Sequence, residues 1–174
     1  PFCEGLNESC PQREVITDKL PKFDFLVISH HHLDHFDLRS LAYLPKDVDV
    51  LIPQDKLIED SLRHLGYSRI YCLKDFETVR MGSTSMMTTR SEMRVPEYGM
   101  IFADESGVFW NAVDTLFSPQ TIQYVRKQYP QIDFLLTPWQ LGMEIVYQCN
   151  QSLSFPVESY SYILHLISLT QPKA

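Results

Sequence analysis

The sequence predicts a layered α/β sandwich. Apolar segments of strand length alternate with segments of helical periodicity over residues 24–65, and five short strand-like segments follow over residues 69–113. Buried strands that alternate with helices indicate parallel βαβ units, whereas consecutive short strands indicate an antiparallel meander. Because 174 residues is the length of one ordinary domain, we expect residues 1–174 to form a single domain.

In the first half of the chain, the apolar residues of the segment 1–22 show no clear periodicity, so we expect a loop there. After it, apolar runs typical of buried strands alternate with helical spacing. Asp37 is in a capping position for the first helix, and Gly66 ends the second. The predicted elements, in chain order, are a strand at 24–29, a helix at 37–44, a strand at 48–52 and a helix at 54–65.

The second half is predicted as a meander followed by helices and one further strand. The last two meander strands are joined by Glu105-Ser106-Gly107, a hairpin signal, and Ser118 precedes Pro119 as the cap of a helix. Residues 132–137 are predicted to form another buried strand. The predicted elements are strands at 69–73, 77–81, 84–89, 99–104 and 108–113, a helix at 119–129, a strand at 132–137 and a helix at 156–170.

Composition narrows the classes of function. The chain has 15 Lys and Arg against 22 Asp and Glu, a net charge of −7 and a pI near 5.3, which argues against a nucleic-acid binder. We expect no membrane span, because no apolar run approaches the required length of about 18 residues. No signal peptide opens the chain, so we expect a cytoplasmic protein. Cys3 and Cys10 are expected either to bridge or to remain two reduced thiols.

The histidine-rich segment Ser29–Asp37 is the motif most indicative of chemistry. Its sequence is Ser-His-His-His-Leu-Asp-His-Phe-Asp, with four of the six histidines in six consecutive positions. His30 and His32 leave the end of a predicted strand two residues apart, so both imidazoles can project to one side. Asp34 and His35 are adjacent on the following turn and can point toward a second position nearby.

This donor set predicts a site for one or two divalent metal ions. Imidazole with carboxylate suits zinc first, with manganese or iron as alternatives. The alternative interpretation is a solvated loop or an adventitious chelator. Several other residues are predicted to be structural: His31 pointing away from the metal, Asp37 as a helix cap, His64 on a helix surface, His165 as a hydrogen-bonded core histidine, and Trp110 and Trp139 in packing.

The segment from Ile28 to Asp37 resembles the metal-binding signature of the metallo-β-lactamase-fold hydrolases. The preceding Leu20–Asp24 is similar to the branch that contains L-ascorbate-6-phosphate lactonase and N-acyl-phosphatidylethanolamine phospholipase D. The resemblance implies an αββα sandwich with two metal ions, whose bridging hydroxide attacks an ester, lactone, amide or phosphodiester. It also implies that Asp114, directly after the apolar residues 108–113, is the bridging aspartate.

The chain departs from the family pattern in three ways. Residues 86–93 contain no histidine where the family places one, so that Glu92 or Ser91 would have to substitute. Val113 replaces the usual glycine before the aspartate. The family also has strands before residue 1 and a histidine-bearing strand after the last helix. We therefore expect a partial fold, from a fragment or a divergent member, without its N- and C-terminal strands.

These features predict a metal-dependent hydrolase with a small-molecule substrate, and a homo-oligomer is compatible with them. His30 and His32 would hold one ion, Asp34 and His35 the other, and Asp114 would bridge, with Asp34 also orienting the nucleophile or taking up its proton. The alternative is a degenerate, non-catalytic member that acts as a binding or structural module. A third hypothesis is redox chemistry at a di-iron centre.

Overall fold

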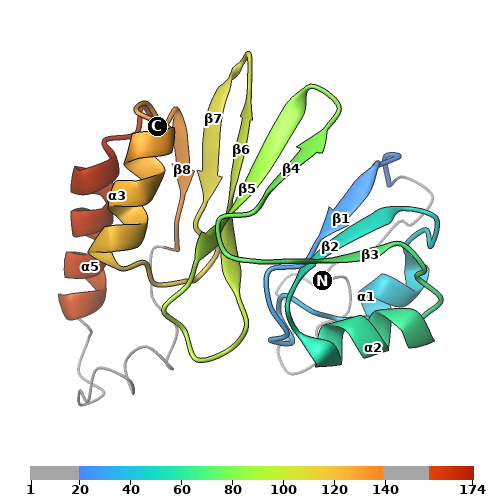
Figure 1. Ribbon diagram of the computed structural model, residues 1–174. Coiled ribbons are helices and arrows are strands. Elements are labelled where there is room, and N and C mark those ends of the chain that lie inside the picture. Colours follow the sequence, from blue (N-terminus) through green and yellow to red (C-terminus); the bar gives the residue numbers. More distant parts are fainter. Residues whose placement is uncertain (1–19, 139–156) are drawn as a thin grey trace. The chain divides into compact units, whose positions relative to one another are not determined.

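The computed structural model describes residues 20–138 and 157–174 (Figure 1). The chain divides into two compact units. The first comprises residues 1–74 and 94–97, and the second residues 75–93 and 98–174. The organisation of the chain as a single domain stays a prediction.

The first unit is a three-stranded parallel sheet with two helices, α1 (Leu38–Tyr43) and α2 (Lys56–His64). The strands lie in the order β1-β2-β3, and β2 pairs in parallel with both neighbours. Figure 1 shows both helices along one side of this sheet. The arrangement is the βαβ pattern that the sequence predicts. The strands are β1 (Phe25–Val27), β2 (Asp49–Pro53) and β3 (Ile70–Leu73).

Polar side chains set where these helices begin. The Asp37 carboxylate accepts the backbone N–H groups of Arg39 and Ser40, which confirms its predicted role as the cap of α1. Asp55 caps α2 in the same way. Gly66 follows α2 with a φ of +93°, a conformation that favours glycine, and so ends the helix as predicted.

A single apolar core holds the first unit together. Strand residues and helix residues far apart in sequence meet in it, which fixes the segment between β1 and α1 at both of its ends. The buried members are Ile28, Phe36, Leu41, Val48, Val50, Ile52, Ile58, Leu62 and Tyr67.

The second unit is a five-stranded mixed sheet in the order β4-β5-β6-β7-β8. Strands β4 to β7 form an antiparallel meander, and β8 pairs with β7 in parallel. The prediction that residues 69–73 begin this meander is wrong, because they form β3, which pairs in parallel with β2 in the first sheet. The helices α3 (Pro119–Gln128) and α5 (Val157–Thr170) lie on one side of this sheet (Figure 1). The strands are β4 (Thr78–Met81), β5 (Thr84–Arg90), β6 (Tyr98–Asp104), β7 (Gly107–Asn111) and β8 (Phe134–Leu136).

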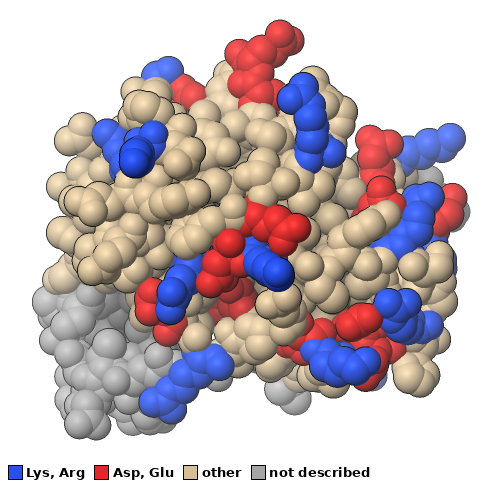
Figure 2. Space-filling model, in the orientation of Figure 1, with Lys and Arg blue, Asp and Glu red and all other residues tan. Residues whose placement is uncertain are grey.

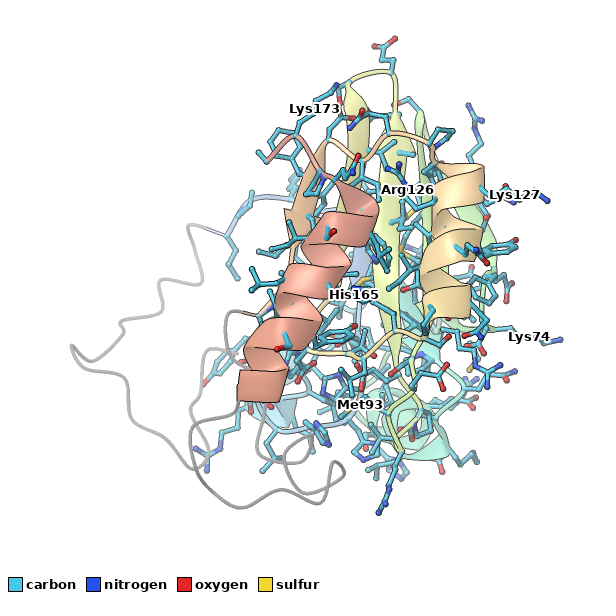
Figure 3. All side chains as sticks on the ribbon, turned by 90° about the vertical axis from the view of Figure 1, so that its left-hand side faces the viewer. Lys74, Met93, Arg126, Lys127, His165 and Lys173 are labelled. Atoms are coloured by element: carbon cyan, nitrogen blue, oxygen red, sulfur yellow. The ribbon has the colours of Figure 1, made fainter. Side chains whose placement is uncertain are left out.

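The core of the second unit lies between the helices and the sheet. Trp110 on β7 is fully buried there against Phe117, with ring centroids 4.9 Å apart, which confirms its predicted packing role. Ile122 of α3 and Leu166 of α5 pack in the same cluster. Nη1 of Arg126 donates to the Thr170 carbonyl at 2.8 Å and ties the two helices together (Figure 3).

Two predictions of burial are wrong in this unit. The strand β8 is not buried on both faces, because Phe134 and Leu136 are 56% and 55% exposed while Leu135 packs toward the core. His165 is not a core histidine: it lies on the exposed side of α5 (Figure 3). Ile163, Leu166 and Thr170 of that helix are buried, and their spacing of three and four residues turns position 165 outward.

Charged side chains of opposite sign lie close together on the face shown in Figure 2. On α2 they form two ion pairs at helical spacing, Lys56 with Asp60 and Arg63 with Glu59. Within the described residues, no helix has the length and apolar character needed to cross a membrane. The predictions for Cys3, Cys10 and Trp139 lie outside the described residues.

Candidate metal centre

The loop between β1 and α1, residues 28–36, contains the histidine motif and is anchored at both ends. Ile28 and Phe36 are 3% and 4% exposed and belong to the core of the first unit. Between them, the His32 carbonyl accepts the backbone N–H groups of His35 and Phe36 at 2.9 and 2.7 Å. These bonds close a tight turn that brings residues 32 and 35 back toward each other. We call residues 28–36 the histidine loop.

Three imidazoles of the histidine loop form one cluster. The ring of His30 lies 4.5 Å from that of His32, edge to face, and 4.3 Å from that of His35 at an interplanar angle of 34°. His30 and His35 each offer a nitrogen, and these two nitrogens lie within 4.8 Å of each other. Two nitrogens about 2.0–2.1 Å from one zinc ion would be separated by no more than roughly 4 Å, so a small side-chain adjustment brings them into range.

Ser29 orients the central imidazole of this cluster. Its hydroxyl oxygen lies 3.1 Å from Nδ1 of His30, and both residues are buried. When Nδ1 carries the proton and donates it to this oxygen, the lone pair of the ring is on Nε2, and this tautomer can bind a metal through Nε2. Ser29 is therefore suited to fix the ligating tautomer of His30.

Asp34 lies on the solvent side of the cluster. Its side chain is 77% exposed, and its Oδ2 is 3.4 Å from Nε2 of His35. An exposed carboxylate at this distance can exchange protons with water and with a neighbouring imidazole. The structure thus places Asp34 and His35 together, as the sequence predicts, and it places His35 beside His30 as well.

His31 faces a different neighbour from the other loop histidines. Its Nδ1–H donates to Oδ2 of Asp55, at the start of α2, at 2.5 Å. This agrees with the expectation that His31 points away from the metal position. Sequence reasoning missed Asp55 as a partner, because the two residues are 24 positions apart and no local pattern links them.

Asp114 belongs to the second unit and lies in the turn that follows β7. In this turn the side-chain oxygen of Asn111 accepts the Val113 N–H at 2.9 Å, and Val113 has a φ of +54°. A β-branched residue rarely adopts this left-handed conformation, and such strain is concentrated at functional sites. Asp114 itself is half-buried.

The two residues considered as substitutes for the missing family histidine have structural contacts of their own. The Ser91 hydroxyl accepts the Met93 N–H at 3.0 Å and is hydrogen-bonded to the Thr115 hydroxyl. Glu92 is exposed, with its carboxylate 3.7 Å from the Arg90 guanidinium. Ser91 thus bonds to its neighbours Met93 and Thr115, and Glu92 lies beside Arg90 on the surface.

Comparisons with known proteins bear on the fold. No protein-family model matches the chain. A UPF0173 protein of Pyrococcus abyssi (strain GE5 / Orsay) is 23% identical over 133 residues, which cover 74% of this chain and 59% of that protein. The structure of CmlA, a diiron beta-hydroxylase from Streptomyces venezuelae, matches with a TM-score of 0.68 and 19% identity, over 89% of this chain and 35% of that one.

Two further solved structures have similar folds. A "possible metal-dependent hydrolase" from Veillonella parvula matches with a TM-score of 0.63 and 16% identity, over 87% of this chain and 59% of that one. The metallo-beta-lactamase fold protein YhfI from Bacillus subtilis matches with a TM-score of 0.52 and 18% identity, over 70% and 50%. The chain thus has a metallo-β-lactamase-like α/β fold and spans less than two thirds of each of these proteins.

Proposed function

We propose that the chain carries the metal centre of a metal-dependent hydrolase that acts on an ester, lactone or phosphodiester. The observation that carries this proposal is the cluster of three imidazoles, 4.3 and 4.5 Å from ring to ring, on a loop with two buried ends. Anchored loops after parallel strands are common positions for ligands in α/β folds. The fold likeness to metal-dependent hydrolases supports the same reading.

The donor set fits a divalent cation. His30 and His35 present nitrogens close to each other, His32 adds a third imidazole, and Ser29 favours the ligating tautomer of His30. Zinc is the first expectation for imidazole with carboxylate, and manganese and iron are alternatives. Because the family histidine expected within residues 86–93 is missing, we propose that one ion is held strongly and a second weakly.

Each residue has a role in this proposal. A bound divalent cation would lower the pKa of water and so supply a nucleophile near neutral pH. His30, His32 and His35 hold the cation. The exposed carboxylate of Asp34 takes up the proton that the reaction releases. Asp114 would add the negatively charged ligand that the family resemblance implies.

We propose a small-molecule substrate with an ester, lactone or phosphodiester group. The resemblance of Leu20–Asp24 to the lactonase and phospholipase D branch supports the last two. A cytoplasmic location and a homo-oligomeric state remain part of this proposal.

A second candidate function is redox chemistry at a di-iron centre. It is favoured by the fold likeness to CmlA, which is described as a diiron beta-hydroxylase. A visible absorption spectrum of protein purified from iron-supplemented cells separates the two candidates. Charge-transfer bands from iron would support the second, and a colourless, zinc-containing protein would support the first.

The hydrolase proposal is tested by metal content and turnover measured on the same samples. We expect close to one zinc per chain, and hydrolysis of a panel of lactones and phosphodiesters that stops in the double variant His30→Ala/His35→Ala. His64→Ala/His165→Ala is the matched control, because both of these histidines are exposed and outside the histidine loop. Zinc binding without turnover of any substrate would favour the non-catalytic binding module instead. Zinc content that is equal in both double variants would refute the site.

A further inference from the structure

We infer that His31 and Asp55 form a positioning pair that holds the histidine loop ready for metal, an inference that rests on the proposed metal site. Nδ1–H of His31 donates to Oδ2 of Asp55 at 2.5 Å. The Asp55 side chain is 6% exposed and that of His31 is 29% exposed. A hydrogen bond to a carboxylate is strong where little water competes for it.

Asp55 is itself fixed by the helix that it caps. Its Oδ1 accepts the backbone N–H groups of Leu57 at 2.8 Å and Ile58 at 3.4 Å, so the two carboxylate oxygens serve different elements. Ile58 and Leu62 are fully buried and hold α2 in the core of the first unit. The carboxylate therefore cannot shift to follow His31 without uncapping the helix, which makes it a rigid point of attachment.

His31 transmits this attachment to the middle of the histidine loop. It lies between His30 and His32 in sequence, and its ring packs edge to face against that of His32 with centroids 5.7 Å apart. Ile28 and Phe36 anchor the ends of the loop, so His31 supplies a third anchor between them. Three anchors over nine residues restrict the backbone from which His30, His32 and His35 project.

The expected consequence is a change in metal affinity. If the loop is loose in the metal-free chain, cation binding must also order it, and the entropic cost of that ordering lowers the affinity. A loop that is already ordered avoids this cost. Groups that orient metal ligands from behind typically change affinity 10- to 100-fold. The competing interpretation is that Asp55 only caps α2 and His31 only covers it, in which case stability alone would depend on the pair.

The test is the zinc affinity of the full chain, measured by competition with a chromophoric chelator. Asp55→Asn keeps a side chain that caps helices well but removes the carboxylate from His31. His31→Phe keeps the ring but removes the donor, and His31→Asn restores an N–H near the position of Nδ1. Ser118→Ala, which removes the cap of α3, is the control for loss of a cap alone.

We expect Asp55→Asn and His31→Phe each to weaken zinc binding about 10- to 100-fold. The double variant should bind no more weakly than the weaker single variant, because both changes break one link. His31→Asn should recover most of the affinity, and Ser118→Ala should bind zinc like the parent chain. Single variants with the parent's affinity, or single effects that multiply in the double variant, would overturn the inference.

Amide hydrogen exchange in the metal-free chain separates this inference from the proposed function. The N–H groups of His35 and Phe36, which close the loop turn on His32, should exchange faster in Asp55→Asn but not in Ser118→Ala. If the parent chain binds no zinc, the proposed function fails. Faster exchange would then still support the positioning pair, and unchanged exchange at both amides would refute it.

Discussion

The two compact units fix their chemistry-bearing residues by different means. In the first unit, side chains hold the histidine loop: two apolar residues are buried at its ends and Asp55 contacts its middle. In the second unit, Asp114 follows a strained turn, in which Val113 is left-handed and its N–H donates to the side-chain oxygen of Asn111. In both units the residue of interest follows a strand with a parallel neighbour, β1 beside β2 and β7 beside β8.

Each unit should therefore be sensitive to a different kind of substitution. A loop held by side chains should lose metal affinity when an anchoring side chain is truncated. A turn held by its backbone should respond to changes in conformational preference at one position.

Truncation of a loop anchor should have the largest effect. Phe36→Ala is expected to lower the free energy of unfolding by about 3–5 kcal/mol and to weaken zinc binding as well. Ile122→Ala in the other unit, at a side chain that is equally buried, should lower stability by about 2–5 kcal/mol and leave the geometry of the histidine loop unchanged. Urea unfolding and chelator competition measure both quantities.

The milder Phe36→Leu keeps the chain folded, so that affinity can be measured even if Phe36→Ala does not fold. Equal losses of zinc affinity in Phe36→Leu and Ile122→Ala would remove the distinction between the two units.

Neutralising the carboxylate of the second unit should weaken zinc binding without unfolding the chain. We expect Asp114→Asn to bind zinc at least about 10-fold more weakly, with the change in unfolding free energy within about 0.5 kcal/mol. Asp75→Asn is the control, since Asp75 is an exposed aspartate in the same unit. A zinc affinity for Asp114→Asn equal to that of the control would take Asp114 out of the ligand set.

Replacing the strained Val113 should raise stability, whereas most substitutions lower it. Val113→Gly is expected to raise the free energy of unfolding by up to about 1 kcal/mol, because relief of left-handed strain exceeds the entropy that glycine adds to the unfolded chain. Gly82→Ala is the reverse change at a φ of +61° with open space around it, and it should cost about 1 kcal/mol. A marked loss of stability in Val113→Gly would show that its side-chain contacts outweigh the strain.

One tyrosine in each unit should make stability sensitive to alkaline pH. Burial raises the pKa of Tyr67 in the first unit, and of Tyr162 in the second, from 10.0 to about 12. Since the folded state resists ionisation, this contribution to stability is full below pH 10 and is lost as the pH rises toward 12. Near neutral pH the unfolding free energy does not change with pH through these two groups.

Thermal melts between pH 9 and 12 test this dependence. The melting temperature of Tyr67→Phe and of Tyr162→Phe should fall less steeply with pH than that of the parent chain, whatever their stability at pH 7. Equal slopes for all three chains would mean that neither hydroxyl is shielded from water in solution.

Much of this fold follows from local sequence signals. Apolar runs and turn residues predicted the elements of both units, and Asp37, Gly66 and Ser118 marked helix ends at the positions observed. The exposure of β8 was missed, because a short apolar run shows nothing about whether a further layer covers its second face. The exposure of His165 was missed because α5 has apolar residues on most of its faces, so that its buried side was ambiguous.

The candidate site was predictable in its residues but not in its contacts. The motif identified His30, His32, Asp34 and His35, since their spacing is unusual. The approach of His30 to His35 depends on the turn closed by the His32 carbonyl, and the bond from His31 to Asp55 depends on how α2 packs. The turn is local but has no residue pattern that identifies it, and the bond to Asp55 is a tertiary contact with no signature in a single sequence.

The most direct test of the metal site is a zinc titration followed by nitrogen-15 NMR of the histidine side chains. We predict that the imidazole nitrogens of His30 and His35 shift strongly on addition of one equivalent of zinc, while those of His64 and His165 do not change. Zinc-induced shifts that are absent from the loop histidines, or equally large at His64 and His165, would contradict the existence of the site.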